Sequence, residues 1–187
     1  GTPCRLFKNR RDGTFTDVAG TIGVTLPTSL VRAGVWGDYD DGDQDLYVFR
    51  ANGNPVSLYR NEGNGTFSDV TSSAGVTFTG NTSTAVWVDV DNDSDLDLMV
   101  YAWRYTNLLY LNQGNGTFLE DAVSRGLTLA NVGGAHWADY DNDGDQDFFS
   151  AGHVAVSQFY ENDGTGHFTE KAADLGLQDG TGKKIGG

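Results

Sequence analysis

The sequence predicts an all-β protein assembled from repeated four-stranded antiparallel units, and three observations lead to this prediction. The chain has 187 residues with 26 glycines and only 3 prolines, and 12% of its residues are aromatic. This composition is typical of many short strands joined by tight turns. Two signatures also recur along the chain at intervals of 50 to 52 residues. Finally, apolar runs of strand length flank short segments rich in Gly and Asp, which is the pattern of β-hairpins.

The first signature occurs four times and aligns without gaps. Its copies read LFKNRRDGTFTDVAGTIGV from Leu6, LYRNEGNGTFSDVTSSAGV from Leu58, LYLNQGNGTFLEDAVSRGL from Leu109 and FYENDGTGHFTEKAADLGL from Phe159. Each copy has a short apolar run, a Gly-containing turn and then a Phe. Asn-Gly, as in Asn64-Gly65, is the strongest short hairpin signal because both residues tolerate positive φ. Each copy therefore predicts the third and fourth strands of a unit.

The second signature occurs three times, between copies of the first. It reads VWGDYDDGDQDLYVF from Val35, VWVDVDNDSDLDLMVY from Val86 and HWADYDNDGDQDFFSA from His136. A Trp-containing strand runs into an acidic loop, and an apolar strand leaves it. These are the first and second strands of a unit. A repeat of about fifty residues with four strands fits one blade of a β-propeller.

The chain is thus expected to hold about three and a half blades. Residues 1–30 supply the third and fourth strands of a partial blade, 31–84 and 85–133 form complete blades, and 134–187 form a blade with a tail. A propeller needs a closed ring or protected edges. We therefore expect further blades or another copy of the chain, as in a homo-oligomer, to complete the ring.

The three acidic loops are predicted to bind metal. Their aspartates are Asp38, Asp40, Asp41, Asp43 and Asp45 in the first, Asp89, Asp91, Asp93, Asp95 and Asp97 in the second, and Asp139, Asp141, Asp143, Asp145 and Asp147 in the third. Five carboxylates within nine residues repel one another unless a cation joins them. Many hard oxygen donors on a flexible loop favour Ca²⁺, so we expect two or three calcium ions. A solvated turn is the alternative for any one such loop, but the threefold repetition favours metal.

The loops differ in detail. The third places oxygen donors at positions 1, 3, 5 and 9 around Gly144, with Asp145 expected to offer its backbone carbonyl. In the second loop Ser94 replaces that glycine, which should strain the turn modestly. The first loop is one residue shorter, so its site is the least secure prediction of the three.

Charge and motifs exclude several classes of function. The formal net charge of −14 leaves no basic stripe for nucleic acid. No apolar run approaches the length of a membrane span, so no membrane insertion is expected. The single cysteine, Cys4, cannot form an internal disulfide. The motifs of serine hydrolases, zinc metalloproteases and P-loop proteins are absent from the sequence, so the chain is not expected to be an enzyme.

At the two signatures the chain resembles the FG-GAP or VCBS repeat family, the calcium-binding propeller of the integrin-α type. The pairing of its acidic loop with LYxNxGxGTFxDVTxxAG is most similar to propellers associated with the ASPIC/UnbV module and to those of the cartilage acidic protein type. The resemblance implies calcium ligands at the aspartates of the second and third loops. The Phe-Gly and Gly-Ala-Pro elements that name the family are not intact here.

We expect ligand recognition on the face opposite the acidic loops, where the repeat varies most. Tyr101, Trp103, Arg104 and Tyr105 form the most suggestive cluster there, because aromatic and Arg side chains favour interfaces and sugar faces. Local packing is the competing interpretation. The sequence thus predicts a secreted or cell-surface binding module for an extracellular protein or glycan. A segment of a larger secreted carbohydrate-active enzyme and a calcium-rigidified scaffold without a specific ligand are the alternatives.

Overall fold

The fold is all-β among the residues that the computed structural model describes, which are 4–25, 31–103, 105–128, 132–152 and 157–177. Fourteen strands form a two-stranded sheet and three four-stranded sheets, all with antiparallel pairing between strands consecutive in sequence. This confirms the predicted fold class. No helix in the described residues is long and apolar enough to cross a membrane.

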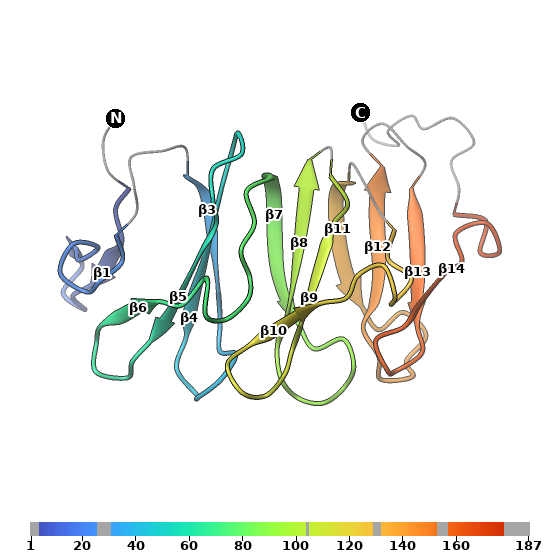
Figure 1. Cartoon of the computed structure of the whole chain (residues 1–187). Coiled ribbons are helices and arrows are strands. Elements are labelled where there is room, and N and C mark those ends of the chain that lie inside the picture. The colour runs from blue at the N-terminus through green and yellow to red at the C-terminus, as the bar shows by residue number, and fades with distance from the viewer. Residues whose placement is uncertain (1–3, 26–30, 104, 129–131, 153–156, 178–187) are drawn as a thin grey trace.

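The sheets follow one another along the chain as the predicted half blade and three complete blades (Figure 1). The half blade has β1 (Phe7–Asn9) and β2 (Phe15–Asp17). The first complete blade has β3 (Val31–Gly37), β4 (Asp45–Arg50), β5 (Ser57–Asn61) and β6 (Phe67–Asp69). The second has β7 (Asn81–Val88), β8 (Asp97–Trp103), β9 (Leu108–Asn112) and β10 (Phe118–Glu120). The third has β11 (Val132–Ala138), β12 (Asp147–Gly152), β13 (Gln158–Asn162) and β14 (Phe168–Glu170).

The first strand of the second and third blades begins slightly earlier than the sequence suggested. β7 starts at Asn81 and β11 at Val132, whereas the predicted blade boundaries are at residues 85 and 134. The strand pairing continues past a register irregularity, between Thr82 and Thr84 in β7. A bulge of this kind interrupts the period-two pattern by which a strand is recognised in sequence.

Each blade repeats the same register. The tryptophan of the first strand lies opposite the residue after the last aspartate of the loop, as in the pairs Trp36–Leu46 and Trp87–Leu98. The apolar side chains on the two faces of a sheet therefore point toward the two neighbouring blades. Tyr47 and Phe49 contribute to the core with the second blade, whereas Leu46 and Val48 face the N-terminal segment.

Aromatic rings fill the spaces between blades. Tyr39 stacks on Trp87 with ring centroids 5.8 Å apart, and both rings contact Phe118. Tyr101 of the second blade stacks on Phe148 of the third in the same way, also at 5.8 Å. These contacts bury large apolar areas, so the repeated aromatic residues contribute to the core between blades.

Backbone hydrogen bonds also join each blade to the next. The Phe that begins each fourth strand donates its N–H to the connecting segment of the preceding blade, from Phe67 to Ile22 O at 2.7 Å and from Phe118 to Ala74 O at 2.9 Å. Glycine permits this close approach. A Cβ on Gly23 would lie 2.3 Å from the carbonyl oxygen of Phe67. The repeated Gly that ends the first signature is thus explained by contact between blades as well as by its positive φ.

Candidate metal centres

The three acidic loops lie at one end of the blades and join the first strand to the second (Figure 1). The turns between third and fourth strands lie at the same end, as expected from up-and-down topology. In each loop the structure brings three carboxylates together, with one oxygen of each within 4.8 Å of the others. The triads are Asp38, Asp40 and Asp45; Asp89, Asp91 and Asp97; and Asp139, Asp141 and Asp147. The first, second and last aspartates of each loop therefore form a potential metal centre.

The last aspartate of each triad is fixed by the sheet, since it is the first residue of the second strand. Asp97 is 1% exposed, and its Oδ1 accepts the backbone N–H of Asn112 at 2.8 Å. Its Oδ2 accepts the N–H of Val90, inside the loop, at 3.0 Å. Asp45 and Asp147 make the same two bonds in their own blades. One carboxylate thus ties the loop to the third strand of the blade.

Burial without a cation makes these carboxylates hard to ionise. Desolvation raises the pKa of Asp45 and of Asp97 to about 7, and two backbone hydrogen bonds to each carboxylate offset part of the rise. Desolvation also raises the pKa of Asp147, and it raises the pKa of Asp91, with the charge of Asp93 adding to the effect. A cation in each loop would therefore stabilise the ionised form of these carboxylates.

The second loop provides a direct test of whether the residues fit a metal ion. Asp89 Oδ1 and Asp91 Oδ1 are buried and have no hydrogen-bond partner. A buried carboxylate oxygen without a partner is costly, and most such groups in proteins are paired. Both residues belong to the triad, so an ion bound there would satisfy both oxygens. The all-carboxylate donor set is hard, which suits Ca²⁺ better than softer metals.

The remaining predicted ligands lie outside the triads. They are Asp41, Asp43, Asp93, Asp95, Asp143 and Asp145. The carboxylates of Asp93 and Asp143 accept the backbone N–H two residues later, at 2.9 and 3.0 Å, and so shape the loop. Asp145 instead accepts a hydrogen bond from the amide of Asn92 in the second loop. The role of the Asp145 backbone carbonyl as a ligand stays a prediction.

Left-handed residues turn each loop back on itself. Gly144 has a φ of 100° and Gly42 a φ of 96°, whereas Ser94 adopts 76° without the freedom of glycine. Ser94 nevertheless donates its N–H to Asp89 Oδ2 at 3.0 Å, the bond that Gly144 makes to Asp139. The serine is therefore accommodated in the same loop conformation, with the local strain expected from sequence.

A pair of asparagines that sequence reasoning missed connects the loops of adjacent blades. Asn112 Nδ2 donates to the carbonyl of Tyr39 in the first loop at 2.7 Å, and Asn162 Nδ2 donates to that of Val90 in the second at 2.8 Å. Both asparagines are buried, at the end of a third strand. The signal was present as the Asn in every copy of the first signature, but its partner lies more than 70 residues away in sequence.

In the predicted ligand-binding cluster, the structure separates Tyr101 from Trp103 and Tyr105. Tyr101 is only 1% exposed, stacks on Phe148, and accepts a hydrogen bond from Trp137 Nε1 at 2.8 Å. It is a core residue, because strand alternation turns its side chain toward the third blade, so its assignment to a binding surface is corrected. Arg104 lies outside the described residues.

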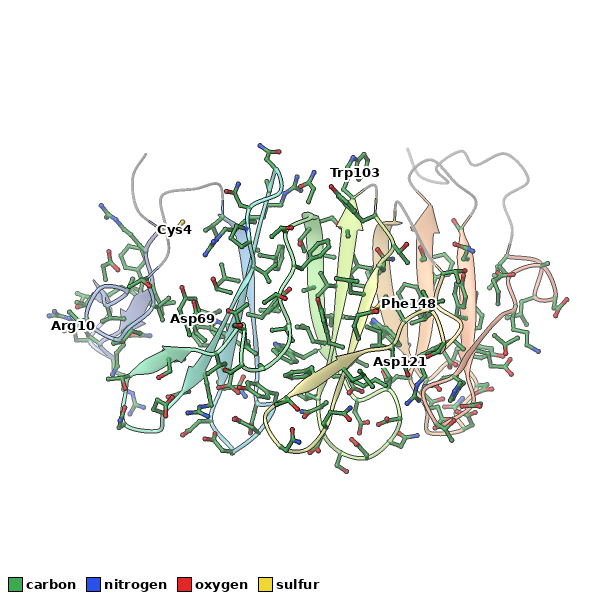
Figure 2. The ribbon with its side chains drawn as sticks, viewed as in Figure 1. Cys4, Arg10, Asp69, Trp103, Asp121 and Phe148 are labelled. Carbon is green, nitrogen blue, oxygen red and sulfur yellow. The ribbon has the colours of Figure 1, made fainter. Side chains whose placement is uncertain are left out.

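Trp103 and Tyr105 do lie at the end of the blades opposite the acidic loops, where Figure 2 labels Trp103. They line a hollow of about 510 Å³ together with Asn52, Gly53 and Asn81. Tyr105 is 52% exposed and contacts Phe78 edge to face. An aromatic surface with adjacent amides therefore exists on the face where recognition was expected.

Four-stranded blades with an acidic hairpin loop define the chain as part of a β-propeller with potential metal centres. The family model of the FG-GAP-like repeat matches residues 39–100 and 101–150, a span that holds the second and third triads whole and the first except for Asp38. The chain belongs to the FG-GAP-like repeat family. No curated protein matches it significantly.

Proposed function

We propose that this chain is a calcium-stabilised β-propeller module that recognises an extracellular protein or glycan. The observation that carries the proposal is the triad of the second loop, in which two buried carboxylate oxygens have no partner other than a prospective ion. Its repetition in three blades supports binding of up to three ions. We also propose that the chain resembles ASPIC/UnbV-associated propellers within its family.

Calcium would act here as a structural clamp. The aspartates of a triad would hold the ion, and none of them forms an ion pair with a Lys or Arg among the described residues. The ion would join the end of the first strand, the loop and the start of the second strand. Extracellular calcium is millimolar, which matches the weak sites of extracellular modules and motivates our proposal of a secreted or cell-surface location.

Recognition is proposed at the opposite end, around the hollow lined by Trp103 and Tyr105. Aromatic rings offer a flat apolar face to a sugar ring or an apolar side chain, and amides offer hydrogen bonds. The chain is proposed to be non-catalytic, because the carboxylate pairs in the triads are already explained by metal binding. Further blades or another copy of the chain are proposed to complete the ring.

Two exposed aromatic residues in the half blade support the proposal that further blades or another copy of the chain complete the ring. Phe7 is 55% exposed and Phe15 is 61% exposed, whereas the corresponding Tyr59 and Phe118 of complete blades are 1% and 8% exposed. Exposed aromatic residues at positions that are otherwise buried favour a protein neighbour.

Calorimetric titration of the metal-free protein with Ca²⁺ tests the main proposal. We expect two or three sites with dissociation constants of about 0.1–1 mM, as in extracellular modules. Each site should add on the order of 1 kcal/mol of stability in 2 mM Ca²⁺, so that chelation lowers the melting temperature. An unchanged melting temperature with and without chelator, together with no heat of binding, would exclude the calcium part of the proposal. Mg²⁺ at the same concentration is the control.

A further inference from the structure

Arg50 is a departure from the repeat that the metal centres do not explain. It lies at the end of β4, five residues after Asp45, and its counterpart five residues after Asp97 is Ala102. The same position of the third blade is Gly152. A long cationic side chain thus stands where the other blades have very small residues, so the fold itself does not require it.

The Arg50 side chain is buried in a face that is otherwise apolar. It is 3% exposed and follows Leu46 and Val48 on the face of β4 that packs toward the N-terminal segment. Its Nη2 donates to Ser57 Oγ at 3.0 Å, whereas its Nε is buried without a hydrogen-bond partner. No ion pair joins it to an acidic group among the described residues. A buried cation without a counter-ion costs several kcal/mol, which an anion would recover.

Arg50 is one of the residues that line a hollow of about 700 Å³. Hydroxyl groups dominate its polar lining, which includes Ser57, Thr71, Ser73 and Thr77. This volume accommodates a monosaccharide unit. Hydroxyls donate to oxyanions, and they both donate to and accept from sugar hydroxyls, so the wall suits a ligand that carries both.

We propose that this hollow binds the carboxylate or sulfate group of an acidic saccharide, with Arg50 as its anchor. The planar guanidinium offers parallel N–H donors that match both oxyanions, and the Nε that lacks a partner is one of them. The hydroxyl wall then binds the sugar to which the oxyanion is attached.

The negative charge of the protein does not oppose binding at this point. The acidic loop of the same blade ends at Asp45, where β4 begins. Arg50 lies five residues further along β4, which is about 17 Å at 3.3 Å per residue. This exceeds twice the screening length of about 8 Å at physiological ionic strength. Asp69 is the nearby exception, because it lines the hollow itself. Its Oδ1 accepts the N–H and the hydroxyl of Thr71, so its carboxylate is oriented by that turn.

The hollow lies beside the proposed recognition surface. The connection between β4 and β5 separates them, since Pro55 and Val56 line the Arg50 hollow while Asn52 and Gly53 line the hollow with Trp103 and Tyr105. The proposal therefore names a ligand class for the recognition part of the proposed function and rests on that part. It does not involve calcium.

The test is NMR titration of the Arg50 Nε–H resonance with glucuronate and, separately, with glucose 6-sulfate, at constant ionic strength set with NaCl. We expect a saturable shift with a dissociation constant on the order of millimolar for at least one of them, and none with glucose. The two arms distinguish a carboxylate from a sulfate. A shift with acetate equal to that with glucuronate would overturn the saccharide assignment.

Three variants sharpen the result. Arg50→Ala, which installs the residue of the second blade, should abolish the ligand-induced shifts of the hydroxyl wall. Arg60→Ala removes the same charge at the far end of β5 and should leave binding unchanged. Asp69→Asn keeps the acceptor for Thr71 but removes the opposing charge, so affinity should rise about twofold to fivefold.

Two outcomes contradict the proposal. Binding that survives Arg50→Ala would place the ligand elsewhere, and a loss of affinity in Asp69→Asn would show that Asp69 assists the ligand rather than opposing it. If Arg50→Ala fails to fold, the Asp69 variant alone decides. Repeating the titration in chelator separates this proposal from the calcium proposal, because anchoring by Arg50 should persist wherever the metal-free protein remains folded.

Discussion

The first and second acidic loops reach the same arrangement with different numbers of residues. Residues 38–45 form a loop that is one residue shorter than residues 89–97, yet each closes a triad with oxygens within 4.8 Å. In both, the last aspartate accepts one N–H from the loop and one from the third strand. The difference between the loops lies in the middle, where the first turns at Gly42 and the second at Asn92 and Ser94.

This comparison shows that the ends of the loop define the centre. The first and second aspartates follow the end of the first strand, and the last one begins the second strand, so the paired strands set their separation. The residues between them act as a spacer that needs a left-handed turn. Loop length alone is therefore a poor guide to whether such a loop can bind metal.

The largest effect should come from removing the aspartate that joins loop and sheet. Asp97→Asn replaces one accepting oxygen with a donor that faces a backbone N–H, and it also removes a metal ligand. We expect a loss of about 2–4 kcal/mol in the free energy of unfolding, measured by urea denaturation in chelator. Asp45→Asn should cost a similar amount, because the two carboxylates make the same bonds.

Asp89→Asn is the matched control, since the carboxylate of Asp89 does not bridge to the third strand. It should weaken calcium binding at the second loop while changing the stability of the metal-free protein by much less than Asp97→Asn. Equal losses in the two variants would contradict the assignment of separate roles to the ends of the loop.

The next largest effect should come from a residue of one blade that contacts the acidic loop of the preceding blade. Asn112→Ala removes the donor to the carbonyl of Tyr39, so it should weaken calcium binding at the first loop although Asn112 belongs to the second blade. We expect a loss of about 1–3 kcal/mol in the free energy of unfolding because a buried carbonyl loses its partner. Calcium titration of the variant, compared with Asn61→Ala in the first blade, measures the effect at each loop. A first loop that binds as in the unmodified protein would show that the contact is dispensable.

A pH dependence should distinguish the metal-free protein from the calcium-bound protein. Burial raises the pKa of Asp45 and Asp97 to about 7, so the folded metal-free protein holds protons that the unfolded chain releases near pH 4. Their contribution to stability is greatest below pH 4 and is lost as the pH rises to 7.

With calcium the direction reverses, because protons compete with the ion, so calcium affinity should fall as the pH is lowered from 8 to 6. Denaturation and calcium titration at pH 6, 7 and 8 check both statements. A metal-free protein that gains stability between pH 6 and 8 would contradict the first.

The smallest effect concerns the middle of the loop. Ser94→Gly should stabilise the second loop by about 1 kcal/mol, because a non-glycine residue in the left-handed region is strained. Gly144→Ser should do the opposite in the third loop. Melting temperatures of both variants in calcium measure the pair, and shifts of the same sign would show that the serine side chain contributes more than its backbone conformation.

Much of this fold was predictable because the repeat makes local signals visible. The hairpins were located from the Trp and Asp of the second signature and from Asn64-Gly65, whose conformations depend on adjacent residues. The acidic loops were found for the same reason. Local sequence does not distinguish the three aspartates of a loop that converge from the two that lie outside the triad, because that distinction depends on strand separation.

Contacts between distant residues were the part that sequence reasoning missed. Tyr101 was expected at the surface because it is close to Trp103 in sequence, yet the alternation of side chains along β8 turns it into the core between blades. No local pattern indicates that Asn112 and Asn162 donate to carbonyl groups of the preceding blade, because those partners lie more than 70 residues away. The burial of Arg50 also follows from packing against the N-terminal segment, which no local pattern indicates.

The glycine that lets one blade contact the next has a consequence for how such chains vary in length. Gly23, Gly75 and Gly126 bring a connecting segment against the backbone of the following Phe, and the bond is made by main-chain atoms only. A main-chain hydrogen bond of this kind does not depend on the identity of the neighbouring side chains. Whole units of about fifty residues can therefore be gained, lost or exchanged, because the same backbone contact forms between any two neighbouring units.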